Sequence, residues 1–366
     1  MRVVVPHMGN LYVALRAVFE ELSVKYVIPP LNSDHTLNLG VSNSPEMVCL
    51  PFKTVLGNWI EGLEAGGDTL IFTEARGICR LGYYFRIQRQ VLEALGYKFS
   101  AVTIKEHSFG ALMGMMKELS PASLLKRIGA LRFGMAKLKV MDNLERLTHK
   151  IRPREKIRGT TTTIYRKGIK AVDDASTMAD LKMTERDYTE KMLGINTNGT
   201  EPLRIGVMGE FFVVLDQFSN LNVEIELGKL GCEVERTLFI SKWTNFAFFL
   251  NPFGITDTKL LHRAAMPYLK SDVGGDGWES VGERVLRTGE LDGLIHLLPF
   301  GCLPEITAQN IMKRMKDKIP VLHIPLDEQT GRAGLLTRLE AFTDMLRRGK
   351  AKQQSRRQLH PPLRSP

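Results

Sequence analysis

The chain has 366 residues, 43% of them hydrophobic and 25% charged, with a formal net charge of +10; this composition is typical of a soluble globular protein with room for two compact domains. No apolar run reaches the roughly 20 residues that a transmembrane helix needs, and the N-terminus lacks the layout of a signal peptide. We therefore expect a cytoplasmic protein whose four cysteines are reduced and serve as metal ligands or catalytic groups rather than as disulfides.

The first 110 residues alternate between strand-like and helical patterns. Strands are predicted at 2–6, 24–28, 69–72 and 99–104, and helices at 11–22, 54–64 and 85–95. A polar loop is expected before the first cysteine, Cys49. Alternation at this spacing predicts a mostly parallel sheet covered by helices on both faces. Residues 1–110 are therefore expected to form a first α/β domain.

Residues 111–199 have a different character. They are rich in Met, Lys and Leu, with helical periodicity and few strand-like runs. Met side chains fill irregular helical cores and adaptable contact surfaces. We expect a helical insert that joins the first α/β domain to a second one.

Strand and helix patterns alternate again over residues 200–345. Asp68 begins an apolar run that leads to Cys79 eleven residues later, and Asp292 begins one that leads to Cys302 ten residues later. The sequence therefore predicts an α/β fold of two doubly wound, mostly parallel-sheet domains of related design, joined by the helical insert.

The C-terminal stretch 346–366 carries much of the positive charge. It contains seven Lys and Arg residues and no Asp or Glu, which leaves a net charge of +3 for the rest of the chain. With two adjacent prolines and several glutamines it is expected to be a basic, disordered tail. Attachment to nucleic acid or another polyanion is one interpretation. A solvated, dispensable extension is the favoured one.

Three of the four cysteines, Cys49, Cys79 and Cys302, lie in short turns marked by Gly or Pro. The last two follow predicted strands, and open α/β sheets bind ligands beyond the carboxyl ends of their strands. If the two domains face each other, the three thiols converge in the cleft between them. The spacing alone matches neither a zinc ribbon nor a ferredoxin run. Cys232 begins a predicted strand instead and is expected to pack as a small hydrophobe.

Five sequence blocks share a pattern with a known family. They are Pro45-x-x-x-Cys49-x-Pro51-x-Lys53-x-x-x-Gly57-Asn58, Gly77-x-Cys79-Arg80-x-Gly82-Tyr83-Tyr84, Met208-Gly209-Glu210, Pro299-Phe300-Gly301-Cys302-x-Pro304-Glu305 and Asp327-Glu328-x-Thr330-x-x-Ala333-Gly334-x-x-Thr337-Arg338-Leu339-Glu340-Ala341-Phe342. With these blocks the chain resembles the iron–sulfur proteins related to 2-hydroxyacyl-CoA dehydratase. It is most similar to their short, single-chain branch, often labelled as related to the CoA-dehydratase activase. The resemblance spans residues 1–345.

The resemblance implies a [4Fe-4S] cluster, or a larger fused one, held by Cys49, Cys79 and Cys302 in the cleft between the domains. It also implies a separate ATP-hydrolysing activator that injects one strongly reducing electron. In the characterised dehydratases this electron converts an acyl-CoA thioester into a ketyl radical, and the open iron site binds substrate oxygen. Those enzymes are built from two different subunits of this type, whereas this is one chain, so a homodimer and a pairing with a related second subunit are both expected arrangements.

Several polar residues are candidates to surround such a cluster. Lys53, Asn58 and Arg80 lie close to cysteines in the sequence, and cationic or amide groups there would offset the negative charge of a thiolate-bound cluster. Glu74 and Glu210 each follow a strand-like run, which makes both candidates to rim the cleft. Ordinary surface solvation is the alternative role for the first three residues. For each acid, capping of the next helix or neutralising a neighbouring Arg is the favoured role.

Two functions follow from this reading. The first is a dehydratase-type enzyme or subunit that performs radical dehydration or reduction of an acyl-CoA thioester, with a buried pocket beside the cluster. The second is a low-potential electron-transfer or accessory protein, with a flat docking surface and no pocket. A membrane partner is not expected, and a nucleic-acid partner through the basic tail ranks third.

Overall fold

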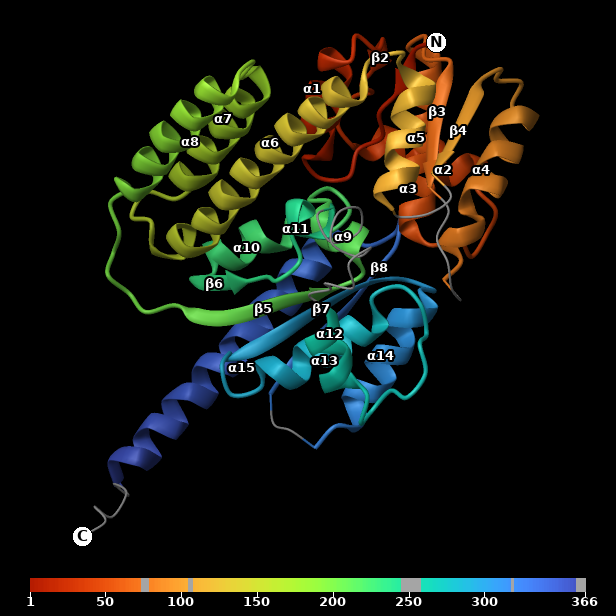
Figure 1. Ribbon diagram of the computed structural model, residues 1–366. Coiled ribbons are helices and arrows are strands. Elements are labelled where there is room, and N and C mark those ends of the chain that lie inside the picture. The colour runs from red at the N-terminus through yellow and green to blue at the C-terminus, as the bar shows by residue number, and fades with distance from the viewer. Residues whose placement is uncertain (74–78, 105–107, 245–257, 317–318, 360–366) are drawn as a thin grey trace.

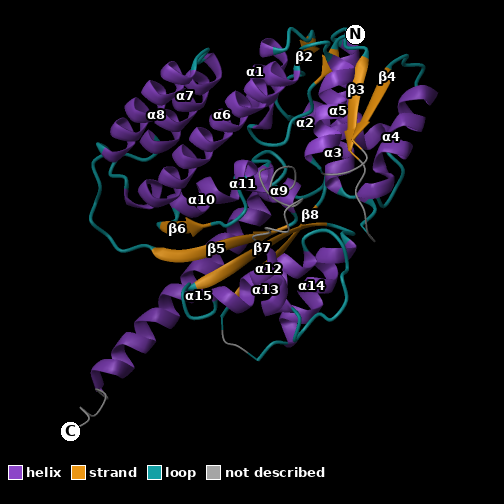
Figure 2. Cartoon of the chain, in the orientation of Figure 1, coloured by secondary structure: helices purple, strands orange, loops and turns teal. Residues whose placement is uncertain are grey.

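A computed structural model describes residues 1–73, 79–104, 108–244, 258–316 and 319–359. Each half of the chain builds a four-stranded sheet in which all strands are parallel, and helices flank both sheets (Figures 1 and 2). The predicted fold class, two parallel-sheet α/β domains, is therefore confirmed.

The two sheets have the same strand order. The first is ordered β2-β1-β3-β4 and the second β6-β5-β7-β8. Their strands are β1 Val3–Val4, β2 Tyr26–Val27, β3 Thr69–Thr73, β4 Ser100–Ile104, β5 Leu203–Gly209, β6 Cys232–Glu235, β7 Gly293–Pro299 and β8 Val321–Leu326. In each half the first strand, β1 or β5, lies between the second and third strands of its sheet. The two halves therefore share one topology.

The aspartates that begin the two matching apolar runs also hold the same place in each sheet. The backbone N–H of Arg2 donates to Asp68 Oδ1, and that of Arg204 donates to Asp292 Oδ2 at 2.8 Å. In both domains the Asp side chain therefore secures the start of the neighbouring strand, β1 or β5. This shared bond supports the relation between the halves that the sequence predicts.

Helices cover both faces of the first sheet. They are α1 Leu11–Glu21, α2 Asp34–Asn43, α3 Leu50–Glu64, α4 Leu81–Ala94 and α5 Phe109–Leu119. Val4 of β1 packs with α3 and α4, whereas its neighbours Val3 and Val5 pack with α1 and α5. Successive residues of a strand point to opposite faces, so each face has its own core.

Helix α2 replaces the polar loop expected before Cys49. It starts with a capping box, in which Ser33 and Thr36 bond each other's backbone N–H groups. The helix packs tightly on α3, because a Cβ added to Gly57 would lie 2.0 Å from the carbonyl oxygen of Thr36, and one added to Gly40 would lie 1.8 Å from that of Lys53. This backbone-to-backbone packing fixes the start of α3, where Cys49 lies.

The helical segment between the sheets is shorter than the predicted insert. Its helices are α6 Leu124–Ile151, η1 Arg152–Arg154, α7 Thr160–Asp174 and α8 Met178–Leu193, and Leu144 of α6 packs with Val172 of α7 in their common core. Residues 109–119, most of which were expected in the insert, form α5. They cover the first sheet because Leu112 and Met116 pack on it.

The second sheet also has helices on both faces. The helices of this half are α9 Phe211–Leu215, α10 Val223–Lys229, α11 Ile240–Thr244, α12 Thr258–Ala265, α13 Gly277–Arg287, α14 Leu303–Arg314 and α15 Arg332–Leu359, and α11 packs with α6 through Ile240. Helices α10 and α15 share one core with the sheet, and α12, α13 and α14 share the other.

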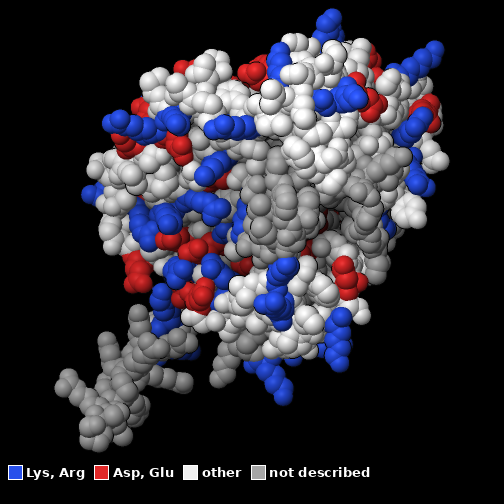
Figure 3. All heavy atoms as spheres, viewed as in Figure 1, with Lys and Arg blue, Asp and Glu red and all other residues white. Residues whose placement is uncertain are grey.

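The tail that was expected to be disordered from residue 346 is helical as far as Leu359, where α15 ends. Leu335, Leu339 and Leu346 anchor α15 on the second sheet, and the rest of the helix projects from the body (Figure 1). Lys, Arg, Gln and Ala favour helix, which explains the continuation. On the face seen in Figure 3, basic and acidic side chains are interspersed over the body.

Within the described ranges, no helix has the length and apolar character that crossing a membrane requires.

Candidate functional site

All three turn cysteines lie at helix starts. Cys49 is the N-cap of α3 and Cys302 the N-cap of α14, both with extended backbone and with Pro in the first turn of the helix. Cys79 directly precedes the N-cap of α4, Arg80, and its carbonyl accepts the N–H of Gly82. Each thiol therefore lies near the positive end of a helix dipole, a setting that favours thiolate ligands.

The Arg80 side chain joins the two domains at these turns. Its Nη1 donates to the carbonyl of Met47 at 2.8 Å, and its Nη2 donates to the carbonyl of Gly301 at 2.7 Å. Those carbonyls belong to the loops that lead into Cys49 and Cys302. One guanidinium thus brings the three cysteine-bearing turns together from both halves of the chain.

Electrostatic coupling of the thiols agrees with this convergence. Burial raises the pKa of Cys49 to about 11, and the neighbouring Cys79 contributes to the rise. Burial also raises the pKa of Cys302, with contributions from Glu305, Glu210 and Cys49. The pKa of Cys79 is raised by its own burial. None of the four cysteines, all of which are described, forms a disulfide, so the three are free thiols at neutral pH.

Tyr84 lies directly against the first of these thiols. Its hydroxyl is 2.7 Å from Cys49 Sγ, and its ring packs edge-on against Phe52 at a centroid distance of 4.9 Å. Burial and the adjacent Cys49 raise the pKa of the Tyr84 hydroxyl, so the hydroxyl stays protonated, and either it or the thiol can donate the hydrogen bond between them. The Tyr84 side chain therefore combines packing in the core with a polar contact to the thiol.

Three carboxyl groups surround the thiols. Glu210 caps α9 by accepting the N–H of Val213 at 3.1 Å, and burial raises its pKa to about 7. Asp276 accepts the N–H of Phe211 at 3.0 Å, and burial together with Glu279, Glu305 and Glu210 raises its pKa. Glu210 therefore has the capping role that was favoured for it, and its carboxyl also acts electrostatically on all three thiols.

Glu305 is the most enclosed of these three carboxyl groups. It is fully buried one turn into α14, where Oε2 lies 2.6 Å from His296 Nε2 and accepts the Ser280 hydroxyl at 2.8 Å. Its Oε1 has no hydrogen-bond partner among the described residues. Glu305 and Asp276 were not predicted from the sequence as neighbours of the thiols. Both acids lie at the start of a helix, α14 and α13, and that position at the carboxyl edge of the sheet could have indicated them.

The other predicted neighbours of the cysteines have different partners. Lys53 is buried and pairs with Glu328, which follows β8, at 2.5 Å between Nζ and Oε1. Asn58 accepts the backbone N–H of His7 at 2.8 Å and donates to Asn32 at 2.8 Å. Both side chains therefore hold the domain arrangement and the loops around the site. Glu74 lies outside the described residues.

The three thiols do not form a compact site for a single metal ion. Among the described residues, the group whose ligand atoms all lie within 4.8 Å of one another is Glu145, His149 and Glu224, so the cysteines do not form such a group. The carboxylate group is already neutralised, because Arg236 donates to Glu145 at 2.6 Å and to Glu224 at 2.8 Å.

Cys232 lies away from this site. It is fully buried on β6 and packs in the core of the second sheet, as expected of a small hydrophobe. It therefore offers a matched control for substitutions of the other three cysteines.

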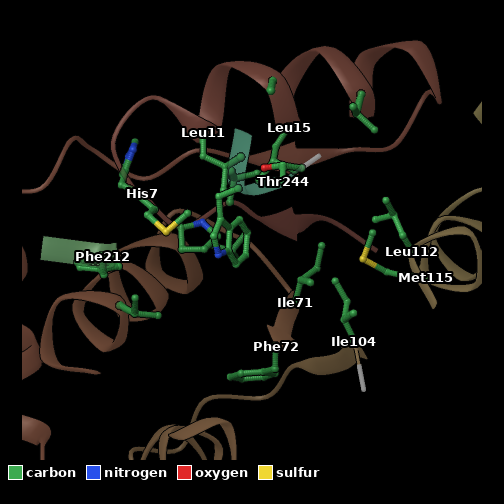
Figure 4. A pocket seen from close by; sticks show the side chains of 18 of the residues that line it. His7, Leu11, Leu15, Ile71, Phe72, Ile104, Leu112, Met115, Phe212 and Thr244 are labelled. Carbon is green, nitrogen blue, oxygen red and sulfur yellow. The ribbon is translucent and has the colours of Figure 1, made fainter. Parts of the chain in front are cut away.

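A cavity of about 310 Å³ adjoins the thiol site. It is lined by the ends of β1, β3 and β4 and by α1, α3, α4, α5, α6, α9 and α11. Tyr84, which touches Cys49, and Glu210 both belong to its wall. Figure 4 shows His7 and Phe212 toward one end of the cavity and Leu112 and Met115 toward the other. The thiol site therefore has a neighbouring space large enough for an organic ligand.

No protein-family model matches the chain, and a search of curated proteins finds no match.

Proposed function

We propose that Cys49, Cys79 and Cys302 hold a [4Fe-4S] cluster, and that the protein performs the radical dehydration or reduction of an acyl-CoA thioester in the manner of 2-hydroxyacyl-CoA dehydratases. The observation that carries this proposal is the bridge made by Arg80 between the Met47 and Gly301 carbonyls. It brings cysteines from two domains to one place, which the binding of a shared cofactor requires.

When bound, such a cluster supplies one-electron reduction and, with three cysteine ligands, an iron position open to substrate. The chain's own residues have supporting tasks. Arg80 holds the ligand loops in register, and the Tyr84 hydroxyl, 2.7 Å from Cys49 Sγ, donates to that sulfur. Cys302 is only 8% exposed, so water is largely excluded from this side of the site, and electrostatic interactions there are strengthened.

The acidic surroundings favour a low reduction potential. Added negative charge near a cluster makes reduction harder, and Glu210 and Glu305 both act on Cys302. A low potential agrees with a separate, ATP-coupled activator as electron donor. This chain has no G-x-x-x-x-G-K-[ST] segment, so ATP hydrolysis is assigned to that partner.

The cavity favours the enzyme over the accessory electron carrier. An electron carrier needs a cluster close to a docking surface, whereas an enzyme needs space for substrate next to the cluster. Tyr84 contacts the Cys49 sulfur on one side and lines the cavity on the other. A substrate in the cavity would therefore lie against a side chain that contacts a proposed cluster ligand.

Electron paramagnetic resonance on the anaerobic, chemically reduced protein tests this choice. We expect the cluster signal to change on addition of an acyl-CoA thioester and to stay the same with free CoA. A clear cluster signal that no thioester alters would contradict the enzymatic role and support the accessory one. Phe substituted for Tyr84 should preserve the signal and alter its response to the thioester.

A further inference from the structure

The cavity beside the thiol site is almost entirely apolar, and its walls suggest what it binds. We propose that it accommodates the hydrocarbon chain of an acyl ligand, with the polar end of that ligand at Glu210 and Tyr84. The identity of the reaction rests on the proposed function above, but the binding of the chain does not.

The cavity lies across the carboxyl edge of the first sheet. Phe52 and Phe72 on its wall belong to the core on the α3 and α4 side, and Phe19, Leu112 and Met116 belong to the core on the α1 and α5 side. A ligand that fills the cavity must therefore follow a path over the sheet edge. A flexible alkyl chain can bend along such a path, and methionine walls adapt to it.

The size of the cavity sets the length of the chain. An apolar cavity of about 150 Å³ holds one benzene molecule. The volume of about 310 Å³ is twice that, so the space corresponds to roughly 12 carbon atoms on the same scale. An acetyl or butyryl group would leave most of it empty.

The polar residues of the wall are few, and two of them, Tyr84 and Glu210, lie beside the thiol site. Glu210 and Tyr84 both line the cavity, and the Tyr84 hydroxyl contacts Cys49 Sγ directly. Leu112 and Met115 lie at the far end from His7 and Phe212 (Figure 4). A sugar or phosphate placed among these aliphatic and aromatic side chains would lose its hydration without new partners. The nucleotide part of a CoA ester therefore has to remain outside the cavity.

Binding measurements with ligands of two lengths test the inference. Isothermal titration calorimetry would compare decanoyl-CoA with acetyl-CoA, and decanoate with butyrate, on the full chain purified anaerobically. Each buried methylene strengthens binding by roughly fourfold at most, so partial burial of the longer chain predicts that decanoyl-CoA binds roughly 100-fold more tightly than acetyl-CoA. A similar preference for decanoate over butyrate would identify the free acid as sufficient, and its absence would assign the CoA ester as the ligand.

Two variants fill the cavity from different helices, Leu15→Trp on α1 and Met115→Trp on α5. Leu125→Trp on α6 is the control, because Leu125 is 82% exposed and does not line the cavity. We expect both filling variants to lose the preference for the long chain and the control to keep it, with thermal melting to show that all three are folded.

The result for chain binding can be distinguished from the result for the proposed iron–sulfur cluster. Equal affinity for long and short chains in the wild-type protein, or a preference that both filling variants retain, would overturn the chain-binding inference even if iron is bound. A long-chain preference in a preparation that holds no iron would support the inference and contradict the cluster assignment.

Discussion

Arg80 and Gly301 are 221 positions apart in the chain, yet Arg80 Nη2 donates to the Gly301 carbonyl at 2.7 Å. Arg80 follows Cys79, and Gly301 precedes Cys302. The bond therefore links the turns that carry two of the proposed cluster ligands, one from each α/β domain. Gly301 has a φ of 76°, a conformation that glycine adopts without strain, and this turn aims its carbonyl at the guanidinium.

Replacing Arg80 by Ala should loosen the site more than it destabilises the fold. The loss of two exposed hydrogen bonds predicts a decrease of about 1 kcal/mol in the free energy of unfolding and a faster loss of iron on exposure to a chelator. Arg89→Ala on the same helix is the control, because Arg89 pairs with Glu93 on the surface and its loss should cost under about 0.5 kcal/mol. Equal chelator sensitivity in both variants would contradict the bridging role of Arg80.

A Gly→Ala substitution at the α2–α3 contact and one at an open position on α5 should have opposite effects on stability. In Gly57→Ala the new Cβ would lie 2.0 Å from the Thr36 carbonyl oxygen, so the helices must separate, at a cost of about 3 kcal/mol. Gly114→Ala on α5 meets nothing within 4 Å and should stabilise by up to about 1 kcal/mol through helix propensity. Urea unfolding of both variants measures the difference, and a neutral Gly57→Ala would contradict the close approach.

The ion pair between Lys53 and Glu328 joins the domains on another side of the site. Glu328→Ala leaves the buried Lys53 ammonium without a counter-charge, so we expect a loss of about 2–3 kcal/mol. Adding Lys53→Met should recover part of this loss, because the uncompensated charge is then gone. Lys170→Ala, which breaks an exposed pair with Asp174, should change stability by less than about 0.5 kcal/mol. Additive losses in the double variant would contradict the coupling.

A buried carboxyl in α6 predicts a pH dependence away from the site. Burial raises the pKa of Asp142 to about 6, although its Oδ2 accepts the Ser241 N–H at 2.9 Å. Between pH 4 and pH 6 the folded protein keeps a proton that the unfolded chain has released, so the free energy of unfolding falls as the pH rises through this range.

Asp142→Asn removes this titration and keeps an acceptor for Ser241. We expect the variant to be more stable than the wild type at pH 7 by about 1–3 kcal/mol and to lose this advantage at pH 4, as measured by urea unfolding across the range. Asp174→Asn, at a carboxyl that is 62% exposed, is the control. The same advantage for Asp142→Asn at both pH values would exclude the pKa shift as its cause.

The fold could be predicted because its signals are local. Apolar runs such as 69–72 gave the strands, and alternation with helices gave the parallel sheets. Helix α2 was missed because its start depends on a capping box at Ser33 and Thr36 rather than on periodicity. Helix α3 begins at Leu50 rather than at residue 54 as predicted. This earlier start also depends on capping, because Cys49 is the N-cap and Pro51 lies in the first turn.

The candidate site could be predicted only in part. The cysteine turns are marked by neighbouring Gly and Pro residues, so the sequence is sufficient to predict that these cysteines lie at helix starts. The partners of Lys53 and Arg80 are 275 and 221 residues away, and no local pattern encodes such distances. Asp276 and Glu305 join the site only because two separate helices of the second domain begin at the same sheet edge.

Iron and acid-labile sulfide per chain, measured on anaerobically purified protein, test the central claim most directly. We predict about four of each per chain, lost in Cys49→Ala, Cys79→Ala and Cys302→Ala and retained in Cys232→Ala, whose residue lies in the core of the second sheet. Metal-free wild-type protein, or equal losses in all four variants, would contradict a cluster held by the three converging turns.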